Sequence, residues 1–266
     1  MTLQKIISSV KSKSAALLLA TCTMNSFSYA DTSPSKNTWK DRWHPVFALG
    51  TGVSTAPHIG VSQYFPIRDP IVDEFYIYSS SQKNQSSGFW DLLLAAEWNI
   101  NQDWMGQAGL DYNQTAPFKV NGTFTQGADM QSADTFSYQY KVLTKQLLVN
   151  GKLLYTLKNY VHPYLSAGLG TAFNKAYHYY TNVPANLTFT RMHLDHTNTS
   201  LSYALGIGID TDINKNLRAG IGYRFTDLGT VQLGKAFIDT SLVSGTLANS
   251  NFQTNEVLIQ LTWVFN

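Results

Sequence analysis

The chain has 266 residues, of which 44% are hydrophobic and 14% are charged, and its formal net charge is +2. This composition is that of a folded protein of one or two domains and excludes an intrinsically disordered chain. The nearly balanced charge removes the electrostatic basis for nucleic-acid binding, so we expect no nucleic-acid partner.

Residues 1–30 have the pattern of a secretory signal peptide. A basic start is followed by the apolar block 15–20, and Ser28-Tyr29-Ala30 places small residues at the −3 and −1 positions of a cleavage site. We predict cleavage after Ala30 in preference to an amphipathic N-terminal helix. Removal of 1–30 would leave 16 basic and 17 acidic residues and, because Cys22 is lost, no cysteine. Residues 31–42 would then be a short periplasmic segment, and 43–266 the folded domain.

No second hydrophobic run of about 18 residues follows the predicted signal peptide, so the sequence offers no further candidate for a membrane helix. A mature chain that enters a membrane must therefore do so as a β-barrel.

Eight segments alternate large apolar residues with small or polar ones, and this period of two is typical of β-strands. In 217–225, for example, every odd position is apolar or aromatic and every even position is glycine or arginine. In chain order, the predicted strands are 45–55, 88–100, 103–115, 136–157, 161–175, 197–210, 217–228 and 252–265. In the fourth, the apolar residues change from even to odd positions, which favours a β-bulge near Val142 and Leu143.

The connections between these strands alternate between short and long. Those near residues 99–102, 158–160 and 211–216 are short, whereas 56–87, 116–135, 176–196 and 229–251 are long. Short turns at one end and long loops at the other are typical of an outer-membrane barrel, whose long loops lie outside. Within the first long loop, Gln63–Phe65 and Phe75–Tyr78 favour a hairpin that extends the barrel wall.

The small face of these strands distinguishes a membrane barrel from a soluble sandwich. A sandwich would turn that face to water, yet it carries paired glycines such as Gly206 and Gly208, or Gly220 and Gly222. In a narrow barrel, glycines in the lumen leave room for a few long side chains. We therefore predict an all-β, up-and-down antiparallel barrel of eight membrane-spanning strands, with short periplasmic turns and long extracellular loops.

Charged residues of both signs fall on the predicted lumen face. They are Asp91, Glu97, Asp111, Lys152, Asp210, Arg218, Arg224 and Glu256. We expect them to form ion pairs that fill the lumen, because an unpaired charge there would be costly. A catalytic constellation of the same residues is the less favoured alternative.

Aromatic residues near the strand ends would form interfacial girdles where they face outward. The candidates are Trp43, Trp90, Trp98, Trp104, Tyr112, Tyr155, Tyr164, Tyr223 and Trp263.

His193-Leu-Asp-His196, with His178 nearby, is the strongest candidate for site chemistry in the long loops. Metal binding would require the imidazoles to converge with a further ligand. Hydrolysis would require a base such as His193 or His196 to meet a hydroxyl at Thr197, Thr199 or Ser200. We favour neither, and we expect no cofactor and no metal.

The segments Pro163–Gly170, Ala204–Asp210, Asn216–Gly229 and the C-terminal run resemble small eight-stranded outer-membrane proteins of Gram-negative bacteria, namely the opacity-type surface antigens and OmpA-type barrels. The resemblance implies outer-membrane lipid and lipopolysaccharide as neighbours. It also implies insertion by the barrel assembly machinery, which reads a last strand ending in an aromatic residue, here Trp263 and Phe265. The sequence departs from that pattern because Asn266 follows Phe265.

The favoured function is a non-enzymatic surface protein of structural or adhesive and antigenic type, with a host-surface ligand bound through the loops. The alternatives are a narrow channel or carrier of small apolar molecules and, less favoured, a lipid A-modifying enzyme.

Overall fold

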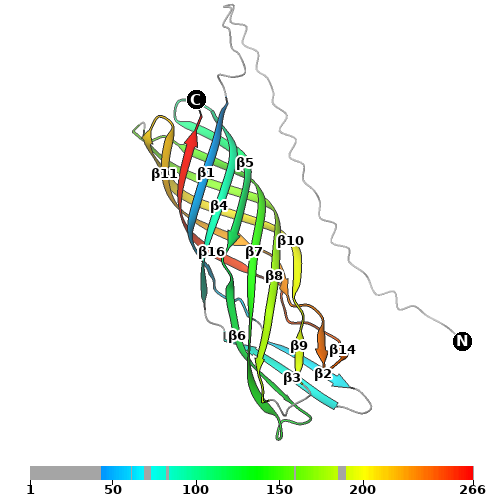
Figure 1. Cartoon of the computed structure of the whole chain (residues 1–266). Helices are drawn as coiled ribbons and strands as arrows, with labels where there is room; N and C mark the ends of the chain where they lie inside the picture. The colour runs from blue at the N-terminus through cyan, green and yellow to red at the C-terminus, as the bar shows by residue number, and fades with distance from the viewer. Residues whose placement is uncertain are drawn as a thin grey trace, which may run out of the picture. The chain divides into compact units, whose positions relative to one another are not determined.

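The computed structural model describes residues 43–60, 62–68, 73–81, 84–158, 160–184 and 190–265. The predicted signal peptide and the segment 31–42 lie outside these residues. The described part is all-β (Figure 1). No helix in it is long and apolar enough to cross a membrane.

Eight long strands form the wall of a barrel. They are β1 (His44–Ala56), β4 (Gln85–Asn99), β5 (Trp104–Thr115), β7 (Asp134–Tyr155), β8 (Val161–Asn182), β10 (His196–Asn214), β11 (Leu217–Asp227) and β16 (Gln253–Val264). Each pairs antiparallel with two others in the order β1-β4-β5-β7-β8-β10-β11-β16, and β16 pairs again with β1. The ring of pairings is therefore closed, and the prediction of eight antiparallel strands is confirmed.

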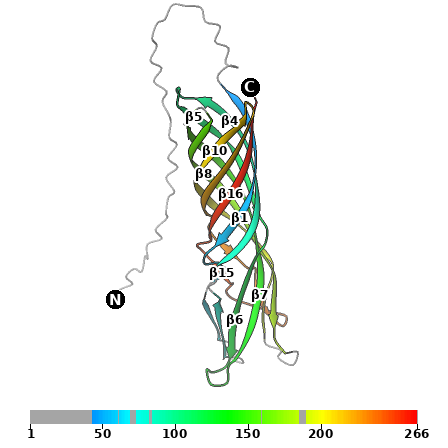
Figure 2. The same ribbon diagram turned by 90° about the vertical axis from the view of Figure 1, so that its left-hand side faces the viewer.

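The two ends of the barrel differ, as the connection lengths predicted. One end carries the start of β1, the end of β16 and the short turns between β4 and β5, β7 and β8, and β10 and β11. The other, here called the long-connection end, carries additional strands (Figures 1 and 2). These are β2 (Gln63–Arg68), β3 (Asp73–Ser80), β6 (Phe118–Gly127), β9 (Arg191–His193), β12 (Val231–Gln232), β13 (Ala236–Ile238), β14 (Ser241–Val243) and β15 (Ala248–Asn249).

Much of the chain that the sequence assigned to long loops is thus sheet. The predicted hairpin is confirmed, because β2 pairs with β3. β3 pairs with β6, and β6 pairs with the first half of β7. The second half of β7 pairs with β5 in the barrel wall, so this one strand belongs to both structures. β8 likewise runs to Asn182, seven residues past its predicted end, and remains paired with β7. Figures 1 and 2 both show β6 and β7 extending past the barrel at this end.

β7 corrects one prediction. Its even-numbered side chains point inward along the whole strand, from Tyr138 through Val142 and Gln146 to Lys152, so the two faces are not exchanged near Val142 and Leu143. The predicted bulge there is wrong. The apolar residues change parity because the strand passes between two environments. Near Lys152 the interior is polar and the outside is apolar, whereas near Tyr138 the interior is itself an apolar core.

That core fills the long-connection end. It contains side chains from all four long connections, among them Tyr78 of β3, Phe118 of β6, Tyr179 of β8 and Phe252 before β16. Phe118 packs edge-on against Phe252 at 5.8 Å between ring centroids, and Tyr78 stacks on Phe124 at 5.5 Å. The four connections are therefore one packed unit.

Candidate functional site

The centre of the lumen is built around Arg224, which β11 directs inward. Its guanidinium donates to Glu256 of β16 at 2.7 Å, to Asp91 of β4 at 3.1 Å and to Asp111 of β5 at 3.3 Å. All four side chains are buried. One cation on β11 thus joins three other strands of the wall, β4, β5 and β16. Charge-assisted hydrogen bonds of this kind are stronger than neutral ones.

A second ion-paired group lies beside the first in the lumen. Lys152 of β7 donates to Asp210 of β10 at 2.6 Å and to the side-chain oxygen of Gln260 at 3.4 Å. Its ammonium group also lies over the ring of Tyr164, 3.8 Å from the centroid. Tyr164 was one of the candidates for the outer girdle, and the structure places it inside the barrel instead.

The third group lies toward the short turns. Arg218 donates to Glu97 at 2.5 Å and to Asp212 at 2.8 Å, and His162 lies 3.1 Å from the other oxygen of Asp212. The structure therefore brings all eight lumen candidates into three ion-paired groups. The sequence reasoning omitted Asp212 and His162, although Asp212 has the same parity as Asp210 and could have been found by that signal.

Glycines leave the space that these groups occupy. A Cβ atom added at Gly50 would lie 1.7 Å from a carboxylate oxygen of Asp91, and one at Gly222 would lie 2.2 Å from the hydroxyl of Tyr164. The cavity that remains among Asp91, Lys152, Arg224 and their neighbours measures only about 30 Å³. A space of this size is about that of one water molecule. The lumen at this level is filled by side chains.

At the long-connection end, Arg191 of β9 joins three of the four connections. It is fully buried, and its guanidinium donates to the carbonyls of Ser244 at 2.7 Å and Gly245 at 2.6 Å. It also stacks on Phe65 of β2, 4.0 Å from the ring centroid, and such contacts gain strength when they are desolvated. No local pattern in the sequence pointed to this residue, because its partners lie far away in the chain.

His193 neighbours this arginine and is buried. Burial, and next the charge of Arg191, lower the pKa of His193 to about 3, so its imidazole is neutral near pH 7. The ring packs against Tyr179 at 4.9 Å and Tyr78 at 6.0 Å between ring centroids. Burial raises the pKa of the Tyr78 hydroxyl to about 12. The side chain is a packing residue in this arrangement.

One candidate hydroxyl and the aspartate of His193-Leu-Asp-His196 are hydrogen-bonded to the backbone. Ser200 donates to the carbonyl of Thr230, and Asp195 accepts from the backbone amide of His178. Within the described residues, no group of three or more His, Cys, Asp or Glu side chains is placed to hold a metal ion. Among the residues that the structure describes, no hydrogen bond joins His193 or His196 to Thr197, Thr199 or Ser200.

The outer surface of the barrel wall is apolar. Exposed side chains cover every wall strand and include Leu94, Leu110, Val149, Leu165, Ile207, Ile221 and Ile259. Aromatic pairs lie near the short-turn end, with Trp43 next to Trp98 at 4.7 Å and Trp104 next to Tyr155 at 4.9 Å. A polar interior and an apolar exterior are the reverse of a soluble protein and fit a wall that faces lipid.

The comparison with protein families agrees with this geometry. Residues 74–265 match the model of the outer membrane protein beta-barrel domain. The chain belongs to this family. It is therefore a β-barrel of the bacterial outer membrane. Barrels of this kind have short periplasmic turns and longer extracellular loops, so we take the long-connection end as the extracellular end.

Solved structures of other outer-membrane barrels are similar at low identity. Neisserial surface protein A is 13% identical with a TM-score of 0.40, covering 82% of this chain and 96% of its own. OprG from Pseudomonas aeruginosa is 14% identical with a TM-score of 0.48, covering 85% and 98%. The outer membrane protease OmpT from Escherichia coli is 9% identical with a TM-score of 0.44, covering 85% and 97%. No curated protein matches the chain.

The closing strand keeps the features predicted for assembly. Val257, Ile259, Leu261, Trp263 and Phe265 point outward. Trp263 packs on Phe47 of β1 at 5.7 Å between ring centroids, and the backbone amide of Phe265 donates to the carbonyl oxygen of Pro45. Recognition of Trp263 and Phe265 by the barrel assembly machinery stays a prediction.

Proposed function

We propose that this barrel is a non-enzymatic surface protein, whose function is contact between its extracellular end and another surface. The observation that supports this best is an apolar row on the outward face of the sheet β9-β13-β14. Phe237 lies directly opposite Met192 on one side and Leu242 on the other. Met192 is 43% exposed and Leu242 is 57% exposed. Exposed apolar residues that gather on one face are typical of protein interaction sites.

The same sheet is tied to its neighbours by a buried side chain, which supports its use as a binding platform. Arg191 lies within β9 and holds the connection that contains Ser244 and Gly245, directly after β14. A rigid surface loses little conformational entropy when a partner binds. β14 is also an edge strand among the described residues, so its backbone groups could pair with a strand of a partner.

The attachment of bacteria to an epithelial cell monolayer tests this proposal. We expect Met192→Ser/Leu242→Ser to reduce attachment roughly tenfold, as loss of two central apolar contacts would. Met130→Ser is the matched control, because Met130 is 70% exposed but lies in the turn between β6 and β7, away from the row. Equal attachment of the double variant and the wild type, at equal surface display, would contradict the proposal.

A channel or carrier is the alternative that the filled lumen disfavours. The wild-type protein in a planar bilayer should show no large steady conductance, because ion pairs occupy the centre of the barrel and an apolar core fills its extracellular end. Arg224→Ala should introduce brief, irregular openings at most. A large and steady wild-type current would favour the channel, and an altered acyl pattern of lipid A on expression would favour an enzyme.

A further inference from the structure

Four lysines gather on the outside of the barrel, on one side only. Lys119 of β6, Lys141 and Lys145 of β7 and Lys175 of β8 all point away from the interior. Lys119 lies directly opposite Lys141, and Lys175 lies opposite Leu143, between the two lysines of β7. None of the four has an ion-pair partner among the described residues. They are here called the lysine patch.

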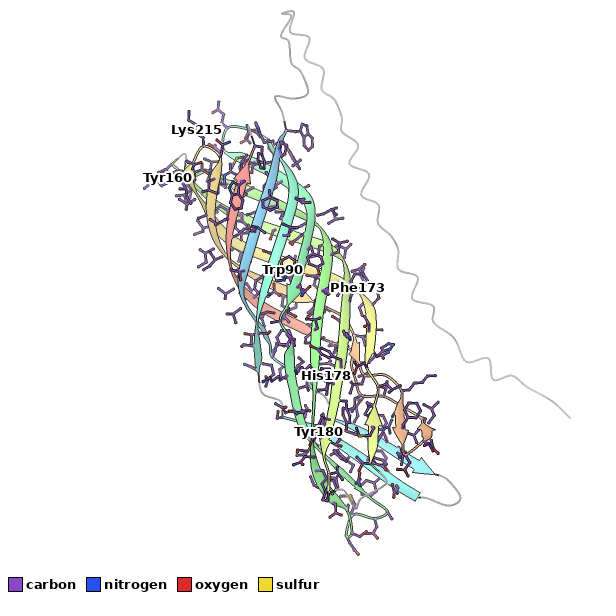
Figure 3. All side chains as sticks on the ribbon, viewed as in Figure 1. Trp90, Tyr160, Phe173, His178, Tyr180 and Lys215 are labelled. Atoms are coloured by element: carbon purple, nitrogen blue, oxygen red, sulfur yellow. The ribbon has the colours of Figure 1, made fainter. Side chains whose placement is uncertain are left out.

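The lysine patch lies where the lipid-facing surface ends. On β7, the outward residues on the periplasmic side of Lys145 are apolar, beginning with Leu147 and Val149. On β8, Phe173 is the last outward apolar residue before Lys175. Figure 3 shows Phe173 on the barrel wall and His178 and Tyr180 progressively farther toward the extracellular end.

The inward side chains of β7 change from polar to apolar at about the same position along the strand. Inward residues of β7 are polar at Gln146 and Thr144 and become apolar at Val142, where the extracellular core begins. The lysines therefore lie at the outer-leaflet interface. The neighbouring strands β5 and β10 carry neutral side chains at the outward positions paired with the patch, namely Gln114 opposite Lys145 and Thr197 opposite Lys175. On β11, the outward residue that follows Phe225 is an acid, Asp227. A general requirement for solubility would not confine the positive charges to β6, β7 and β8.

A bulge beside the patch forms a hollow. Gln139 pairs with Tyr180 and Lys141 with Tyr177, so β8 contributes one extra residue at this point, where His178 has a φ of 55°. The hollow has a volume of about 330 Å³, and its lining includes Lys119, Lys141, His178 and Tyr180. Asp195 lies beside it but accepts the amide of His178. The hollow is thus bordered by Lys119 and Lys141, and it lies on the extracellular side of the outermost apolar residues, Leu147 and Phe173.

We propose that the lysine patch binds the phosphate groups of a phosphorylated outer-leaflet glycolipid, the lipid A part of lipopolysaccharide, with its acyl chains against Leu147 and Phe173. Like charges directly opposite each other destabilise a sheet, and a phosphate between Lys119 and Lys141 would reverse that effect. Lysines at an anionic membrane surface gain about 1 kcal/mol each. The position at the interface, rather than at the tip, favours a lipid over a soluble polyanion.

Binding of fluorescent lipopolysaccharide to the full mature barrel in neutral detergent micelles tests the proposal. We expect Lys141→Gln/Lys175→Gln to weaken binding about thirtyfold, as the loss of two such interactions predicts. The control Lys158→Gln/Lys235→Gln removes the same charge at exposed sites away from the patch and should change affinity less than about twofold. Heat-modifiable gel mobility establishes that each variant is folded.

Two further probes identify the source of the phosphate. Dephosphorylated lipopolysaccharide should bind the wild type as weakly as intact lipopolysaccharide binds the patch variant. Inorganic phosphate at matched ionic strength should not compete, whereas lipid A should. Equal affinity of the wild type and the patch variant overturns the proposal, and so does full competition by inorganic phosphate or by a soluble polyanion such as heparin.

Discussion

Arg224→Ala should destabilise the barrel by about 3–5 kcal/mol, the usual cost of removing one partner from a buried ion-paired group. Arg224 is 5% exposed, and its removal leaves the carboxylates of Asp91, Asp111 and Glu256 together without their shared cation. The free energy of unfolding by urea in detergent micelles, followed by tryptophan fluorescence, measures this change.

Two further variants distinguish loss of charge pairing from loss of packing. Arg224→Ala/Glu256→Gln should recover part of the stability, because it removes one of the uncompensated carboxylates without restoring any volume. Arg218→Ala should cost less than Arg224→Ala, since its partner Asp212 is more open to solvent, with 29% of its side chain exposed. If the double variant is as unstable as Arg224→Ala, packing rather than electrostatics dominates.

Val149→Arg is expected to cost about 2–4 kcal/mol, the penalty for an arginine on the lipid face of a barrel near the bilayer midplane. Val149 is 65% exposed and lies within the outward apolar row of β7. Leu194 is the matched control, because it is similarly exposed, at 52%, but follows β9 at the extracellular end, where its surroundings are water. Leu194→Arg should therefore change stability by less than about 0.5 kcal/mol, as surface substitutions in water do.

Refolding into vesicles of defined lipid and unfolding by guanidinium measure both variants. A similar cost for the two substitutions would mean that Val149 does not face lipid. In that case the lipid-facing surface of β7 would also not extend up to Lys145.

The sequence was sufficient for the barrel wall because its signals are local. Alternation with period two identified all eight strands, and the glycines of the small face, such as Gly222, decided which face lines the lumen. The same parity placed Arg224 and Glu256 inside, but not as partners, because that pairing depends on how strands far apart in the chain are staggered around the ring.

The extracellular end could not be predicted in the same way. The change of apolar parity in β7 suggested a bulge at Val142, yet it reports the passage from a lipid-facing wall to a structure with its own core. Arg191 was missed because β9 is three residues long and its contacts come from Phe65, Ser244 and Gly245, which only the folded chain brings together.

Because the four long connections share one core, their sequences cannot change independently during evolution. Where surface loops are independent, each can be exchanged under immune selection without regard to the others. Here Tyr78, Phe118, Tyr179 and Phe252 come from four connections and pack as one cluster. Substitutions in one connection must therefore be matched in the others, and variation should accumulate at solvent-facing positions such as Met130 while the cluster changes in concert or not at all.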